Sequence, residues 1–370
     1  MRYPVTIHYE RPARSQAMEL DCRVEIQSRE SRMARSPTAG LIQLSSCSRM
    51  LYSFFHSIVI SKYVMGFLPS MQRSGPSGYG ASTTAEQVTV GFDLSARTYL
   101  VTGCNSGLGK ETVRVLALRG ARVLALARTL EKAKQVSERM PGNVVPICCE
   151  LSEPRSIRAA IQEVKRLNVD LDAVIANAGI MALPTLEQKN GYELQFFVNH
   201  VGHFLLVTGL LEQLAADGRV VMLASAAHEM TYREGVQFDN LSGEKGYSPW
   251  KAYGQSKLCN LLFARHLATC LPVAGQSANA VHPGVIATSL MRNMNPLITV
   301  ASRLVSPIFM KTVAQGAATQ VFVASHPSLA GVNEKYFSDC NEKKSSRYGR
   351  DSALAATLWE KTHGIIEAFG

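Results

Sequence analysis

From about Thr98 onward, short apolar runs rich in β-branched residues alternate along the chain with longer stretches of helical character. Runs that are apolar nearly throughout are typical of strands buried on both faces. Strands that alternate with helices predict a parallel sheet covered by helices on both sides, so we expect one doubly wound α/β domain. The expected strands are TYLVTG, ARVLALAR, NVVPICC, LDAVIANAG, GRVVMLAS and SANAVHPG, and the expected helices span 107–119, 129–139, 155–167, 193–213 and 250–270.

A glycine-rich turn follows the first expected strand, in the stretch YLVTGCNSGLGKETVRVLALRG. Gly103, Gly107 and Gly109 are spaced as G-x-x-x-G-x-G, directly before a predicted helix. A turn without Cβ atoms lets backbone N–H groups approach a pyrophosphate, and the helix N-terminus adds its positive dipole end. The sequence therefore predicts a dinucleotide site at this turn.

The end of the second expected strand indicates which dinucleotide binds. A carboxylate there would bind the ribose 2′-hydroxyl of NAD and repel the 2′-phosphate of NADP. In this chain the position is Ala127, and Arg128 follows it. The missing carboxylate and the added guanidinium favour NADP(H). Alternatively, Arg128 is an ordinary surface residue that opens the next helix, and Lys110 either adds positive charge to the site or faces solvent.

The stretch YSPWKAYGQSK contains a Tyr followed four residues later by a Lys twice, beginning at Tyr247 and at Tyr253. Such a pair can work together only if both side chains project from one helical face. Pro249 is favoured at the first position of a helix and Ser248 is a good N-cap, which leaves Tyr247 outside the helix. Tyr253 and Lys257 therefore form the pair that we expect to share a face.

Tyr253, Lys257 and Ser225 have the chemistry that an alcohol–carbonyl interconversion needs. A free tyrosine, with a pKa of about 10, holds its proton too firmly for rapid exchange at neutral pH. A nearby ammonium stabilises the phenolate and lowers that pKa, so we expect Lys257 to tune Tyr253. Ser225, at the end of the fifth expected strand, can donate a hydrogen bond to the substrate oxygen.

Together these motifs resemble the short-chain dehydrogenase/reductase family. The resemblance rests on T-G-x-x-x-G-x-G, on NAG at 177–179, on VNHVGHFLL and on HPGVIAT at 282–288, and it covers roughly residues 85–367. It implies a Rossmann fold with a mostly parallel sheet, and hydride transfer between nicotinamide C4 and a substrate carbon.

The resemblance also implies a role for each catalytic residue. Tyr253 would be the acid/base, and Lys257 would tune it and bind the nicotinamide ribose. Ser225 would orient the carbonyl, and Asn199 would hold a water that links Lys257 to solvent. The implied coenzyme-binding residues are Gly103, Asn105, Ser106, Gly107, Leu108, Gly109, Arg128, Glu150, Leu151, Asn177, Ala178, Gly179, Tyr253, Lys257, Pro283, Gly284 and Thr288.

One position departs from the family pattern. Family members usually carry an Asp before a Leu after the third strand, where the carboxylate contacts the adenine amine. This chain has Glu150 before Leu151. The longer carboxylate can keep that contact, so we retain it as an expectation.

Within the family, the chain resembles the branch of retinol dehydrogenases and the WW-domain-containing oxidoreductase, although no WW module precedes the domain. Residues 285–312 are rich in Met, Leu, Ile and Val, which suits a lipophilic substrate such as a retinoid, steroid or lipid aldehyde.

Two alternative functions stay open. The protein could be a catalytically weak NADP(H)-sensing regulatory or scaffold protein of organelle membranes. The second alternative is a protochlorophyllide-reductase-like enzyme.

Residues 1–80 differ in composition from the rest of the chain and are expected to be largely disordered. They carry ten of the basic and five of the acidic residues, so they contribute +5 of the net charge of +10. Residues 51–68 are largely apolar, but Lys62 makes a full membrane span costly. A membrane anchor, an import peptide and a disordered extension ending in the flexible linker SGPSGYGAS all remain open; a secretory signal is not expected.

Composition also limits the partners. The eight cysteines include no C-x-x-C, which favours free thiols in a reducing compartment over a metal site. No aromatic-and-basic pattern indicates nucleic-acid binding. We expect a small lipophilic substrate, and membrane association through residues 51–68 at the endoplasmic reticulum or another organelle. A homodimer stays open.

Overall fold

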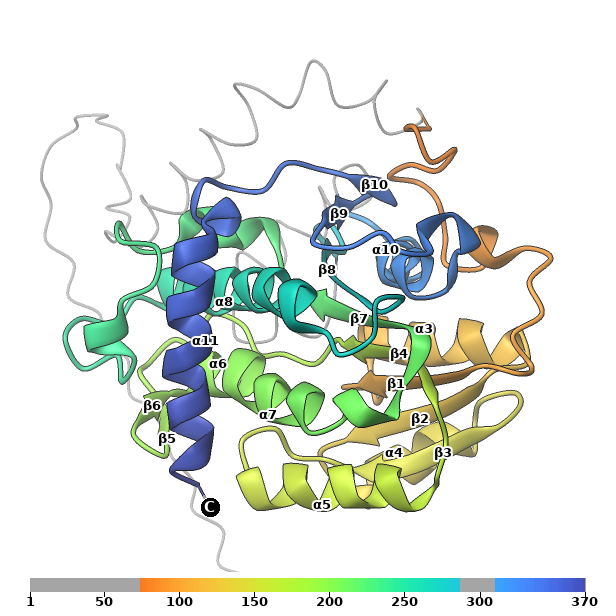
Figure 1. Ribbon diagram of the computed structural model, residues 1–370, viewed down its shortest axis with the longest axis horizontal. Coiled ribbons are helices and arrows are strands. Elements are labelled where there is room, and N and C mark those ends of the chain that lie inside the picture. Colours follow the sequence, from red (N-terminus) through yellow and green to blue (C-terminus); the bar gives the residue numbers. More distant parts are fainter. Residues whose placement is uncertain (1–73, 287–309, 370) are drawn as a thin grey trace, which may run out of the picture. The chain divides into compact units, whose positions relative to one another are not determined.

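The computed structural model describes residues 74–286 and 310–369, and at its centre is one large sheet (Figure 1). The eight strands lie in the order β10-β9-β8-β7-β4-β1-β2-β3, and every neighbouring pair is parallel except β9 and β10. The strands are β1 (Thr98–Thr102), β2 (Arg122–Ala127), β3 (Val144–Cys148), β4 (Leu171–Ala176), β7 (Leu214–Leu223), β8 (Ser277–His282), β9 (Tyr336–Ser338) and β10 (Asn341–Glu342).

Helices cover both faces of this sheet (Figure 1). Residues of α3, α4 and α10 pack on one face, and residues of α5, α7 and α8 pack on the other, with α11 against α8. The helices are α3 (Gly107–Leu118), α4 (Leu130–Ser137), α5 (Pro154–Arg166), α6 (Leu194–Phe196), α7 (Gly202–Thr208), α8 (Pro249–Cys270), α10 (Val313–Ser325) and α11 (Ser352–Glu367).

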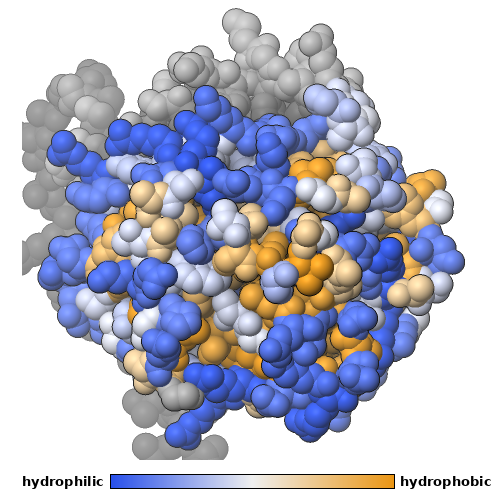
Figure 2. Space-filling model, viewed as in Figure 1, coloured by the Kyte–Doolittle hydropathy of each residue, from blue (hydrophilic) through white to orange (hydrophobic). Residues whose placement is uncertain are grey.

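The central strands are largely apolar because both faces of the sheet are covered. Tyr99 and Val101 of β1 belong to the core beside α3 and α10, whereas Leu100 belongs to the core on the opposite face. This is the alternation of successive side chains in a strand. The outer helices are amphipathic instead: α5 buries Ile157 and Val164, and hydrophilic residues dominate the rim of the face in Figure 2.

The predicted doubly wound α/β fold is confirmed, and each of the six expected strands is present. The expected helix over 193–213 is interrupted. Its first turn, α6, runs into a π-helix over Phe197–Val201 before α7 begins, and β7 starts at Leu214. Strands β9 and β10 and helices α10 and α11 lie outside the expected elements.

The segment 74–82 departs from the expected flexible linker. Ser77 N donates to Asn341 Oδ1 over 3.0 Å, and Asn341 Nδ2 donates to the Tyr79 carbonyl over 3.0 Å. The Tyr79 ring packs edge-on against Phe322 of α10, with the ring centroids 5.5 Å apart. The linker prediction is therefore wrong for these residues, because aromatic packing and the Asn341 amide hold them on the domain.

Two other expectations concern segments that the structure does not describe. The apolar run 51–68 lies outside the described residues, as does most of 285–312. Within 74–286 and 310–369, no helix has both the length and the apolar character needed to span a bilayer. The six cysteines in these ranges are all free.

Candidate active site

The glycine turn lies at the carboxyl end of β1, where it meets the loop after the neighbouring strand β4. A Cβ atom on Gly103 would lie 2.9 Å from Ala178 Cα, and one on Gly109 would lie 2.3 Å from the Gly103 carbonyl oxygen. Gly103 also has φ +68°, which favours glycine. Only glycine therefore fits at Gly103 and Gly109, and the turn closes tightly against the NAG stretch.

The first turn of α3 leaves its backbone N–H groups available to an anion. Ser106 is the N-cap, but its side chain makes no capping hydrogen bond, and no acidic residue lies in the first turn. Ser106 and the preceding Asn105 are exposed, and Gly107 and Leu108 are half-buried. An uncapped helix N-terminus beside a glycine turn fits the pyrophosphate of a dinucleotide.

The end of β2 carries the residues predicted to select the coenzyme. Ala127 is the last residue of β2 and is buried, whereas Arg128 is exposed. Among the described residues, Arg128 has no ion-pair partner. Its guanidinium is therefore available for a phosphate group, as the preference for NADP(H) requires.

The NAG stretch is fixed by hydrogen bonds to β1. Asn177 Nδ2 donates to the Thr102 carbonyl over 2.7 Å, and the Ala178 N–H donates to Thr102 Oγ1 over 2.9 Å. A Cβ atom on Gly179 would lie 3.1 Å from Asn199 Oδ1 and 3.3 Å from Lys257 Nζ. The turn, the NAG stretch and the candidate catalytic residues thus meet at one place.

Helix α8 begins at Pro249 with Ser248 as its N-cap, as predicted. Tyr253 and Lys257 lie within it, both buried, and Lys257 Nζ lies 5.7 Å from the centroid of the Tyr253 ring. Tyr247 precedes the helix, and its hydroxyl donates to the Leu183 carbonyl over 2.7 Å. The geometry therefore places Tyr253, and not Tyr247, next to a lysine one turn later on the same helix.

Protonation of the pair is governed mainly by burial. Burial raises the pKa of Tyr253 to about 12, although a hydrogen bond with the Ser225 side chain lowers it. Burial lowers the pKa of Lys257 to about 8, and Lys257 Nζ donates to the Leu223 carbonyl over 3.0 Å. Burial therefore shifts the pKa of Tyr253 upward, and the tuning of Tyr253 by Lys257 stays a prediction.

Asn199 lies in the π-helix between α6 and α7, and its side chain ties three segments together. Oδ1 accepts from the Ile180 N–H over 2.8 Å, and Nδ2 donates to the Ile180 carbonyl and to Ser256 Oγ, each over 2.9 Å. Such π-turns occur frequently at functional sites. The role of holding a water for Lys257 stays a prediction.

His203 connects Asn199 to the glycine turn, a link that no sequence motif indicated. His203 Nδ1 lies 2.8 Å from the Asn199 carbonyl oxygen, which can only accept, so Nδ1 donates. Nε2 then accepts from the Thr102 hydroxyl over 2.9 Å. Burial lowers the pKa of His203 to about 4, so the ring is neutral at pH 7. Its position one helical turn after Asn199 is the signal that could have revealed the link.

Comparison with known proteins identifies the family. A sequence profile of the short chain dehydrogenase family matches residues 97–298. The chloroplastic short-chain dehydrogenase TIC 32 B of Brassica napus is 40% identical over 310 residues, covering 80% of this chain and 97% of that protein. This chain belongs to the short-chain dehydrogenase family.

Other relatives agree with the retinol dehydrogenase-like branch. Retinol dehydrogenase 12 of Mus musculus is 39% identical, over 73% of this chain and 86% of that protein. The human WW domain-containing oxidoreductase is 35% identical, over 78% of this chain and 72% of that protein. A crystal structure of an uncharacterized protein from Mycobacterium paratuberculosis superposes with a TM-score of 0.62 at 29% identity, covering 76% of this chain and 97% of that one.

Members of this short-chain dehydrogenase family bind a nicotinamide coenzyme, and this chain's uncapped α3 terminus and Cβ-free turn fit one. Glu150, the departure from the family pattern, uses Oε1 to accept from both the N–H and the hydroxyl of Ser152, each over 3.0 Å. Leu151 is buried, and its carbonyl would lie 2.4 Å from a Cβ on Gly202. Contact of Glu150 with the adenine amine therefore depends on its other oxygen and stays a prediction.

The remaining implied coenzyme contacts follow β8. Gly284 has φ +93°, and a Cβ there would lie 2.7 Å from Lys311 Cδ, so this turn is also restricted to glycine. Pro283 precedes it and is half-buried. Thr288 lies outside the described residues. Within the described ranges, no group of three or more His, Cys, Asp or Glu residues is arranged to hold a metal ion.

Proposed function

We propose that this short-chain dehydrogenase is an NADP(H)-dependent enzyme that interconverts an alcohol and a carbonyl, on a lipophilic substrate. The observation that carries the proposal is the meeting of Tyr253, Lys257 and the Ser225 hydroxyl beside Gly179. A proton donor, a cation and a hydrogen-bond donor for the substrate oxygen are what carbonyl reduction requires of the protein.

In the proposed reaction, the Ser225 hydroxyl binds the carbonyl oxygen and Tyr253 donates a proton to it. Burial keeps Tyr253 protonated at pH 7, so it can act as the donor once the Lys257 charge favours its phenolate. The Lys257 ammonium, 5.7 Å from the ring centroid, stabilises the phenolate that remains. Bound NADP(H) supplies the hydride in reduction and accepts it in the reverse direction.

The preference for NADP(H) over NAD(H) is tested at the end of β2. We expect Ala127→Asp to weaken NADPH binding at least about tenfold, about 1.4 kcal/mol, because a carboxylate would repel the 2′-phosphate. Gln135→Asp, on the exposed side of α4, adds the same charge further along the helix and is expected to change the NADPH Kd little. Titration of both variants with NADPH and NADH measures the effect. Equal weakening in both variants would contradict the preference.

The pKa of Lys257 predicts how the reaction depends on pH. Burial lowers this pKa to about 8, so the ammonium is present below pH 8 and is lost above it. Since the ammonium stabilises the phenolate, we expect kcat/KM for carbonyl reduction to fall about tenfold per pH unit above about pH 8. Lys257→Arg, which keeps the charge, is expected to remove this limb. A wild-type rate that stays constant up to about pH 10 would contradict the assignment.

The lipophilic substrate is proposed from the sequence beyond β8. Val285, the residue after Gly284, is 61% exposed. The apolar stretch 285–312 begins there. Relatives named as retinol dehydrogenases support a substrate of this kind.

A second candidate function is an NADP(H)-sensing regulatory or scaffold protein of an organelle membrane. The 40% identity to a chloroplastic relative over 97% of its length favours it. Purified protein mixed with NADPH and a series of retinoid, steroid and fatty aldehydes separates the two functions. An enzyme consumes NADPH with at least one of them. Tight NADPH binding without consumption across the series would favour the sensor.

A further inference from the structure

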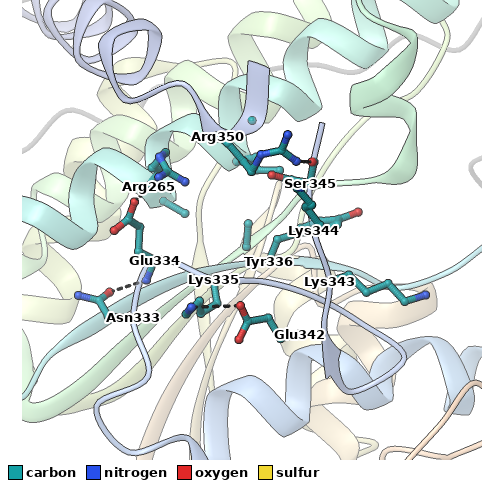
Figure 3. A pocket seen from close by; sticks show the side chains of 14 residues that line it. Arg265, Asn333, Glu334, Lys335, Tyr336, Glu342, Lys343, Lys344, Ser345 and Arg350 are labelled. Carbon is teal, nitrogen blue, oxygen red and sulfur yellow. Dashed lines mark hydrogen bonds and ion pairs between the residues drawn. The ribbon is translucent and has the colours of Figure 1, made fainter. Parts of the chain in front are cut away.

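A cavity of about 510 Å³ lies beside β8 and β9 (Figure 3). Its walls are the C-terminal half of α8, the segment that enters β9, and residues 342–350. None of the predicted coenzyme-binding residues lines it. The glycine turn follows β1 and Gly284 follows β8, whereas this cavity is lined by Ala280 within β8 and by residues 333–336 at the start of β9. It is therefore a separate site.

The lining of this cavity is strongly basic. Five basic and two acidic side chains line it, a net charge of +3 in one small space. The segment KKSSRYGR, residues 343–350, holds four basic residues and no acidic one. Low-dielectric walls around like charges concentrate a positive potential inside a cleft. The charge of the cavity therefore selects an anion.

Only part of this charge is neutralised by neighbouring carboxylates. Arg265 pairs with Glu334 over 2.6 Å, Lys335 with Glu342 over 3.1 Å, and Lys343 with Asp339, which does not line the cavity, over 3.1 Å. Lys344 is exposed and has no ion pair within the described part of the chain. The Lys335–Glu342 pair is also about half exposed, so its ammonium can reach a second anion. Cations on opposite walls thus remain available to one ligand.

The wall that carries the basic segment is anchored to the fold. The Lys343 N–H donates to the Tyr336 carbonyl over 2.8 Å, Ser346 N–H donates to His228 Nε2 over 3.1 Å, and Arg350 donates to the Ser345 carbonyl. The rings of His228 and Tyr336 also pack edge-on, with centroids 5.3 Å apart. A backbone held in this way loses little conformational entropy when a ligand binds.

We propose that this cavity binds a small anion that carries phosphate groups. A phosphate has a charge of about −1.5 to −2 at pH 7 and three strong acceptor oxygens, which match ammonium and guanidinium donors from several directions. Its source is either a soluble phosphate ester or the headgroup of an anionic lipid, since both present the same group.

Isothermal titration of the full-length protein with inorganic pyrophosphate at fixed ionic strength tests the proposal, with NADPH present at saturation so that the glycine turn is occupied. We expect saturable binding that Lys344→Glu weakens about fivefold or more and Glu342→Gln tightens about threefold, because these changes lower and raise the local positive charge. Lys361→Glu on α11 makes the same change in net charge outside the cavity and is expected to leave the Kd unchanged.

The source of the phosphate is distinguished by sedimentation with vesicles of phosphatidylcholine containing a minor fraction of phosphatidate. Vesicle binding that Lys344→Glu reduces would indicate a lipid headgroup, and pyrophosphate binding without vesicle binding would indicate a soluble ester. No saturable binding of pyrophosphate, or equal weakening by Lys344→Glu and Lys361→Glu, would overturn the proposal. Neither measurement depends on the enzyme being active.

Discussion

Tyr253→Phe is expected to lower kcat by about 10²–10⁴-fold, the usual contribution of a positioned general acid. The substitution removes one oxygen and keeps the buried ring, so α8 and the position of Lys257 should be preserved. NADPH binding is expected to stay within about twofold, since the proton donor acts on the substrate. Steady-state kinetics combined with NADPH titration separates the two effects.

Tyr247→Phe is the matched control, because the same atom is removed from the tyrosine just before α8. The Tyr247 hydroxyl donates to Leu183 O and accepts from Gln195 Nε2 over 3.0 Å. Its loss should lower the free energy of unfolding by about 1–3 kcal/mol and leave substantial activity. If Tyr247→Phe abolished turnover and Tyr253→Phe did not, the assignment of the proton donor would be wrong.

Gly109→Ala is expected to weaken NADPH binding about 10- to 100-fold. The added methyl would lie 2.3 Å from the Gly103 carbonyl oxygen and 2.5 Å from Asn177 Nδ2. Because one of these atoms is backbone, the turn itself must move, at a cost of about 1–3 kcal/mol. The displaced turn no longer presents its N–H groups to the pyrophosphate. Titration of NADPH fluorescence measures the loss.

Gly364→Ala in α11 makes the same substitution at a helical glycine with open space around it. No heavy atom lies within 4 Å of the position of its Cβ. It should stabilise the protein by up to about 1 kcal/mol through helix propensity, with NADPH binding unchanged. Equal NADPH affinity in Gly109→Ala and Gly364→Ala would rule out the proposed role of the turn.

The sheet was predictable from the sequence because both of its faces are buried. Strands β1 to β4 and the second half of β7 are then largely apolar runs, which are visible without any structure. The start of α8 was predictable as well, since Pro249 is suited to the first helical position and Ser248 to the cap. The strands and the start of α8 depend on residues that are neighbours in the sequence, so they could be predicted from it.

The features that sequence reasoning missed depend on contacts between distant residues. The π-helix at Phe197–Val201 lies within an apolar stretch that reads as one continuous helix. The packing of 74–82 depends on Asn341, more than 260 positions away along the chain. Hydrophobic periodicity carries no information on either, because both arise from tertiary contacts.

The candidate site was predictable in its residue types but not in its electrostatics. Tyr253, Lys257 and Ser225 meet as the motifs indicated. The direction of the pKa change at Tyr253 was not foreseen, because it depends on how completely α8 buries the phenol. The link from Thr102 through His203 to Asn199 likewise requires the turn after β1 to lie beside the π-helix.

Transfer of deuterium tests the central proposal most directly. The protein is incubated with NADPH that carries deuterium at nicotinamide C4 on the transferable face, together with a lipophilic aldehyde, and the alcohol is analysed by mass spectrometry. We predict an alcohol that carries one deuterium with the wild-type protein, and at most a trace with Tyr253→Phe. Unlabelled substrate recovered intact from wild-type protein that is saturated with NADPH would contradict the account.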